Sequence, residues 1–264
     1  MPRLRDYLDN GRESALEIAE SYLPGAPLEE QIEAFRVFCL SLKMVAYGYL
    51  LVEADTDAFF LNLHRVAANG HRLLQIAWEQ SHGAEAIAAS ANDPLLAAIL
   101  TDPTLASHIA TLSNRKLTPP EYDDELWAAV FFQDAVLGRP AEVLEANVAK
   151  IEAYLEEETP RTAAFRALAR RDAKAFDDAF AAWNAAAAEE LDASADGGGT
   201  YSSGITRHIW LEGLAFIDLA AARGLSLPAQ LRPKLPVQFL TARRPAPPFA
   251  PAILGVTRIS PELL

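Results

Sequence analysis

Apolar residues recur at intervals of three and four along almost the whole chain, and this spacing is typical of amphipathic helices. The longest run extends from Leu28 to Glu53, and a second run, from Asp57 to Gln80, follows after a turn of only a few residues. A connection this short predicts that the two helices pack antiparallel as a hairpin. A shorter helix is expected before them, over Leu4–Leu23, ending at Pro24 and Gly25.

The same pattern continues through the centre of the chain in shorter pieces. Several short helices are expected in Ala84–Leu112, where two Asp-Pro pairs mark helix starts. A loop follows at Leu112–Tyr122. Beyond it, the pattern predicts four further helices, over Asp123–Leu137, Pro140–Glu157, Pro160–Arg171 and Asp172–Leu191. We therefore expect a single domain, 1–264, which either stays undivided or forms two packed lobes of residues 1–115 and 116–225.

One helix near the end of the chain, expected over Ile205–Gly224, is apolar around most of its circumference. Such a helix has to be enclosed by the others. Thr206 would cap its start, and Glu212 would pair with His208 one turn earlier. The side chains that we expect to be buried include Trp210 and Phe216.

The regions on either side of this helix have a different composition. Ala193–Gly204 is rich in glycine and serine and is expected to be a flexible loop. The last part, 226–264, contains many prolines and should form an extended tail that packs on the helices. The side chains expected to hold it there are Leu235, Phe239, Leu240 and Phe249. No segment alternates as a strand does. The fold class is therefore all-α, an irregular array of antiparallel helix hairpins with a Pro-rich extended C-terminal tail.

Composition and charge narrow the class of protein. The formal net charge of −13 and the pI of about 4.8 argue against nucleic-acid binding through a basic face, and favour a basic partner. The first residues lack the apolar run of a signal peptide, and the most apolar helix is interrupted by Arg36 and Lys43. With Cys39 as the only cysteine, no internal disulfide can form. We expect a cytoplasmic protein with no membrane contact.

The negative charge is concentrated in the middle of the chain. Eleven acids lie between Glu121 and Glu158, against Arg139 and Lys150, whereas the region 223–258 carries only bases. We interpret the acids of this region and of the following helix as a docking surface for a cationic protein. The residues expected to form it are Asp123, Asp124, Glu142, Glu145, Glu152, Glu156, Asp177 and Asp178. The alternative is that these acids simply lie on the solvent-exposed faces of their helices and bind no partner.

Several patterns suggest chemistry but are incomplete. Arg65 and His71 have the spacing of the catalytic motif of HEPN ribonucleases, although an apolar residue, Val66, follows the arginine. Glu79 and His82 have the spacing of bundle di-iron ligands, but no second pair exists. The stretch 199–206 has the outer spacing of a P-loop without its lysine, and the serines at positions 202 and 203 lack a nucleophile elbow. We expect no catalytic residue, no cofactor and no metal.

Three segments together resemble one known family. The sequence HIWLEGLAFIDLAAARGLSLPAQLRPKLPVQFL, starting at His208, is similar to the carboxy-terminal region of immunity protein family 49 of bacterial polymorphic toxin systems. The loop Ser113-Asn114-Arg115 and the joint Leu168–Asp172, which leads into Phe176 and Phe180, also resemble that family. The resemblance covers nearly the whole chain.

This resemblance implies a cytoplasmic antitoxin that binds and blocks a toxin encoded by a neighbouring gene. It implies no catalytic residues, and occlusion of a basic, nuclease-like toxin domain by the acidic region 121–192 is the expected mechanism. Two other functions remain open. The chain could be a helical-repeat-like scaffold for another protein, or a HEPN-type ribonuclease that uses Arg65 and His71.

Overall fold

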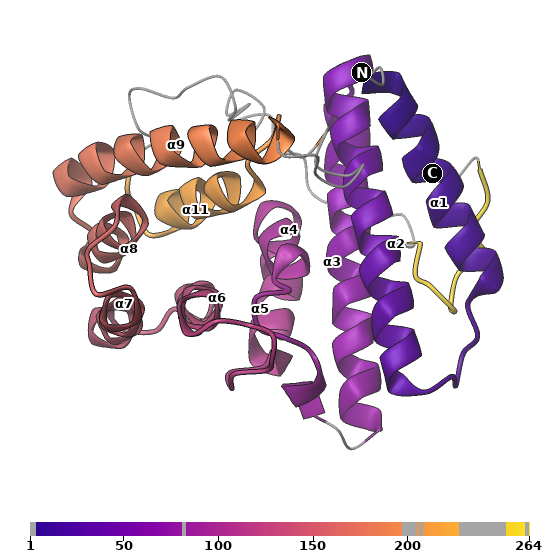
Figure 1. Ribbon diagram of the computed structural model, residues 1–264, viewed down its shortest axis with the longest axis horizontal. Coiled ribbons are helices and arrows are strands. Elements are labelled where there is room, and N and C mark those ends of the chain that lie inside the picture. Colours follow the sequence, from indigo (N-terminus) through magenta and orange to yellow (C-terminus); the bar gives the residue numbers. More distant parts are fainter. Residues whose placement is uncertain (1–3, 81–82, 197–204, 206–207, 227–251, 262–263) are drawn as a thin grey trace.

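The computed structural model describes residues 4–80, 83–196, 205, 208–226, 252–261 and 264. Throughout these residues the regular structure is helical and no strand is formed, so the expected all-α class is confirmed (Figure 1). One large cluster of buried side chains extends from Tyr7 to Leu264 and includes residues from both sides of the loop at 113–122.

Three long helices form one side of the molecule. They are α1 (Leu4–Ser21), α2 (Leu28–Gly48) and α3 (Thr56–Glu79), and α2 lies against both others (Figure 1). The last residues of this run, Tyr49–Glu53, form a single π-helical turn. The chain then reverses at Ala54, which adopts the left-handed conformation with φ 52°, and Asp55 caps α3 by accepting a hydrogen bond of 2.9 Å from the Ala58 amide.

The segment Leu28–Glu53 is long and apolar enough to cross a membrane by length and composition alone. Within its most apolar window, 61% of the residues are buried inside the protein, where α2 contacts α1 and α3. A core helix of a soluble protein meets the same criterion, and this packing agrees with that interpretation.

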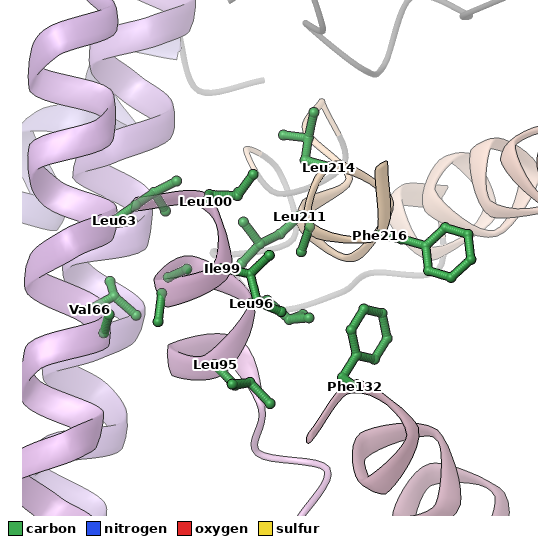
Figure 2. Close-up of a cluster of buried hydrophobic side chains, with 14 of the residues drawn as sticks. Leu63, Val66, Leu95, Leu96, Ile99, Leu100, Phe132, Leu211, Leu214 and Phe216 are labelled. Carbon is green, nitrogen blue, oxygen red and sulfur yellow. The ribbon is translucent and has the colours of Figure 1, made fainter. Parts of the chain in front are cut away.

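Two short helices join this side of the molecule to the rest. After the 3-10 turn η2 (Gly83–Ala86) come α4 (Asp93–Thr101) and α5 (Pro103–Leu112). Every residue from Leu95 to Leu100 is buried. Figure 2 shows the reason: α4 lies between Leu63 and Val66 of α3 on one side and Leu211 and Leu214 of the last helix on the other. The apolar residues of α4 therefore pack against both α3 and the last helix.

The second half of the chain is a series of helices in which each packs on the next. These are α6 (Asp123–Val136), α7 (Ala141–Leu155), α8 (Pro160–Arg170) and α9 (Ala173–Asp196). In Figure 1 they wind around α11 (Leu211–Ala222), which lies beside α9 and reaches α4.

Aromatic side chains fill the space between these helices. Trp210 and Phe216 are buried as expected, at 8% and 0% exposure, and Phe216 contacts rings from α6, α8 and α9. The full cluster is Phe131, Phe132, Phe165, Phe176, Phe180, Trp183, Trp210 and Phe216. A Cβ added at Gly213 would lie 2.2 Å from Cε3 of Trp210, so only glycine allows this indole to lie flat on the helix.

Two expected boundaries differ from the structure. The enclosed helix begins at Leu211 rather than at Ile205, and His208 lies in a turn before it. His208 and Glu212 therefore do not lie on a common helix, and Glu212 forms an ion pair with Arg161 of α8. In addition, α9 continues to Asp196, into the segment expected to be a loop. Thr206 and 197–204 lie outside the described residues.

The described part of the tail is fixed to the first helices. Asn69 of α3 donates a hydrogen bond of 2.7 Å to the Ala252 carbonyl and accepts one of 2.9 Å from the Leu254 amide. Tyr49 donates to the carbonyl oxygen of Leu264 at 3.0 Å. The four residues expected to hold the middle of the tail, Leu235, Phe239, Leu240 and Phe249, lie outside the described residues.

Candidate functional site

The helix α7 presents acids outward because its apolar residues occupy one stripe. Leu144, Val148 and Ile151 are buried against neighbouring helices, whereas Glu142 and Glu156 are exposed. Glu156 follows the last turn in the left-handed conformation with φ 59°. Among the described residues, neither carboxylate takes part in an ion pair, so both are accessible to an external partner.

Two other acids of this helix are already paired. Arg170 of α8 binds Glu145 with contacts of 2.9 and 3.2 Å, and Arg166 of α8 binds both oxygens of Glu152 at 2.6 and 2.5 Å. The hydrogen bond from Arg170 holds the pKa of Glu145 below its ordinary value. These pairs neutralise the side of α7 that faces α8, and the surface is less negative than the sequence suggests.

The remaining expected acids lie on two other helices. Asp177 and Asp178 are exposed on α9, and Asp123 and Asp124 are half-buried in the first turn of α6, where the helix dipole favours them. Because α8 lies between α7 and α9, the eight acids do not form one cluster. The unpaired exposed group comprises Glu142, Glu156, Asp177 and Asp178, and we call it the outer acid set.

Two acids from the acid-rich region of the sequence are structural. Asp134 is 1% exposed and accepts hydrogen bonds of 2.8 Å from both Arg115 and Asn147. Glu121 is also buried and accepts from the backbone amides of Ser90 and Thr118. Neither contributes charge to the surface.

The arginines of α8 are the residues that the sequence analysis missed. The acid-rich region of the sequence ends at Glu158, just before Arg161, Arg166 and Arg170. The sequence does contain a signal for these ion pairs. The arginines belong to the helix that follows α7 after a short connection, and consecutive helices usually pack together.

A polar cleft of about 340 Å³ lies between the two halves of the molecule. It is lined by two ion pairs, Lys43 with Asp93 and Arg161 with Glu212. The Arg161 guanidinium also lies near the rings of Phe165 and Trp183, at 5.4 and 5.9 Å from their centroids. The fifth charged residue of the wall, Glu125, accepts a hydrogen bond of 3.1 Å from the Tyr122 amide at the start of α6. The two ion pairs therefore join the two halves of the molecule at this cleft.

The two residues of the ribonuclease alternative, Arg65 and His71, lie in different surroundings. Arg65 is 3% exposed and donates a hydrogen bond of 2.8 Å to Asn62 on its own helix. His71 instead stacks on His108 of α5, with 5.7 Å between ring centroids, and burial together with His108 lowers the pKa of His71. A buried arginine cannot reach a phosphate group in solvent, so this arrangement gives the HEPN hypothesis no support.

The remaining candidate reactive groups include the Cys39 thiol and the Glu79 carboxylate. Burial raises the pKa of the Cys39 thiol to about 12, and its sulfur lies 3.7 Å from the Val66 carbonyl, so it is not poised as a nucleophile. Within the described residues no group of three or more His, Cys, Asp or Glu side chains could hold a metal ion. Glu79 pairs with Arg72 at 3.1 Å. His82 and the serines at 202 and 203 lie outside the described residues.

Comparisons with known proteins add no relative. Neither the protein families, nor the curated proteins, nor the solved structures contain a match to this chain.

Proposed function

We propose that this chain is an immunity protein that binds and neutralises a cognate secreted bacterial toxin in the cytoplasm of the cell that makes both. The outer acid set supports the proposal: Glu142, Glu156, Asp177 and Asp178 are exposed, and no ion pair engages them within the described structure. The resemblance of the sequence to an immunity family and the net charge of −13 point in the same direction.

The proposed mechanism is steric and electrostatic occlusion of a basic toxin domain. Carboxylates on packed helices lose little conformational freedom on binding and attract a cationic surface over a distance of about 8 Å at physiological salt. A specific interface of this type buries roughly 1,600 Å² and depends on a few anchoring side chains. Tyr154, exposed on α7, is an aromatic candidate for such an anchor.

The direct test is co-expression with the product of the adjacent gene. We expect this chain to co-purify with that product and to restore growth that the product alone arrests. The informative variant replaces the outer acid set, Glu142→Gln, Glu156→Gln, Asp177→Asn and Asp178→Asn. The matched control replaces four exposed acids of α1 by the corresponding amides, so its net charge changes by the same amount. These acids are Asp9, Glu13, Glu17 and Glu20.

We expect the outer-set variant to bind the toxin at least tenfold more weakly, mainly through slower association, and the α1 variant to bind like the original protein. Equal weakening by both variants would show that only net charge matters. Unrelieved toxicity in the presence of the unaltered protein would overturn the proposal.

The same assay separates the two other functions. A scaffold for a different protein would leave the toxin active. A ribonuclease would arrest growth when expressed alone, and Arg65→Ala or His71→Ala would relieve that arrest, whereas an immunity protein is harmless by itself.

A further inference from the structure

A second cavity, separate in character from the polar cleft, lies between α2, α3 and the segment that leads into α4. Its volume is about 540 Å³, within the range of small-molecule sites. Most of its surface is apolar, and the larger side chains that line it come from α2, α3, α4 and α5: Phe35, Leu40, Leu73, Leu74, Leu95 and Ile109.

The sequence explains why this space is not filled. The segment 86–91 reads Ala-Ile-Ala-Ala-Ser-Ala, so five of the six residues that cover the cavity have very small side chains. Beside it, a Cβ at Gly70 would lie 2.2 Å from Cβ of Pro94, so α3 and the start of α4 are already in closest contact. Protein interiors are normally packed as densely as organic crystals. A hollow of this size is therefore a feature of the fold.

A buried polar atom in the cavity wall has no hydrogen-bond partner among the described residues. Gln133 of α6 is 1% exposed, and its side-chain amide donates a hydrogen bond of 3.1 Å to the Asn114 carbonyl. Its Oε1 is buried and accepts no hydrogen bond from any described residue. A buried acceptor without a donor is unfavourable, and most such atoms in folded proteins are paired.

The other buried polar side chain of the wall, that of Asn114, is occupied within the protein. Asn114 bonds to the carbonyl of Lys116 and to Thr118, and Ser113 donates to Ile109. The two charged lining residues are paired as well, Arg36 with Glu33 at 2.6 Å and Asp93 with Lys43. A charged ligand would find no free counter-charge there, whereas a neutral ligand with one donor would complete the wall.

We propose that this cavity binds a small, uncharged, mainly aliphatic molecule that carries one hydrogen-bond donor, and that the donor is directed at Oε1 of Gln133. The proposal concerns a different part of the molecule from the outer acid set and does not depend on a toxin.

The test uses two isomeric probes that differ only in the donor, n-heptanol and hexyl methyl ether. Binding to the purified full-length protein is measured by titration calorimetry. We expect both probes to bind and the alcohol to bind about fivefold more tightly, which is the effect of one neutral hydrogen bond.

Two variants assign the binding to the cavity. In Gln133→Met the acceptor is lost with little change of volume, so the two probes should bind equally. In Ile87→Trp the larger side chain should fill the cavity from the segment 86–91 that covers it, where Ile87 is half-buried. Neither probe should then bind. If Gln133→Met does not fold, the comparison of alcohol with ether on the original protein still tests the recognition of the donor.

Absence of heptanol binding, equal binding of both probes to the original protein, or unaltered binding in Ile87→Trp would each overturn the proposal.

Discussion

At the scale of single residues, Asp134 has the environment of a structural anion. Its side chain is almost fully enclosed on α6, with Arg115 from the preceding loop and Asn147 from α7 as its partners. Removing one partner of a buried ion pair leaves an uncompensated charge, which costs far more than the pair contributes at a surface. The stability of the α6–α7 contact therefore depends on Arg115.

Replacement of Arg115 by Met should lower the free energy of unfolding by about 3 kcal/mol, because the buried side chain of Asp134 would lose the guanidinium that compensates it. Urea denaturation measures this loss. The control is Arg5→Met, which breaks the exposed pair with Glu53 and should cost less than about 1 kcal/mol. Equal losses in the two variants would show that the Asp134 site is open to solvent.

Asp134 also shows what a count of acids cannot reveal. The sequence places it in an acid-rich region, and only the structure shows that it faces inward while Asp177 faces solvent. A local signal existed, because Gln133 and Asp134 interrupt a helix that is otherwise apolar between Leu126 and Val136. Such residues require partners, but the partners lie elsewhere in the chain, and periodicity does not identify them.

At the scale of elements, most helices were predictable because the local chemistry marks their ends. Proline occupies the first turn of α4, α5 and α8, and a capping aspartate precedes α3 and α5. The late end of α9 was missed because Ala193–Asp196 has no helix breaker before Gly197. The start of α11 was missed because apolar spacing continues upstream of Leu211, although the backbone of Trp210 is extended.

The contact between α3 and α5 should depend on pH. Burial lowers the pKa of His71 and of His64, and His108 contributes to the shift at His71. The folded protein therefore binds fewer protons than the unfolded chain, in which histidine titrates near about 6.5. The free energy of unfolding should fall as the pH drops through that value toward the folded-state pKa.

Urea midpoints measured between about pH 7.5 and 5.5 test this prediction. The decrease at low pH should become smaller in His71→Gln, and also in His108→Gln, which removes the like charge opposite His71. An unchanged pH dependence in His71→Gln would assign the effect to other groups.

At the scale of the whole molecule, the described residues of the tail act as a clamp on the first helices. Asn69 is fully buried and binds both Ala252 and Leu254, so its loss would leave two backbone groups without partners. Asn69→Ala should destabilise the protein by about 2 to 4 kcal/mol. It should also make the C-terminal residues more sensitive to carboxypeptidase.

A matched control is available on the same helix. Asn62 is equally buried, but its described hydrogen bonds reach only Ala58 and Arg65. Asn62→Ala should therefore reduce stability without increasing cleavage of the tail. If both variants lose the tail equally, the tail is held by general packing and not by the Asn69 side chain.

The clamp at Asn69 also has a consequence for the order of events during synthesis. Its partner Ala252 lies 183 positions later in the chain. At typical ribosomal speeds, roughly 10 to 40 s separate the emergence of the two residues. Throughout that interval Asn69 lacks both of its partners in the last segment and keeps only its hydrogen bond to the Arg65 carbonyl within α3. The first three helices therefore reach their final stability only when the last segment has been translated.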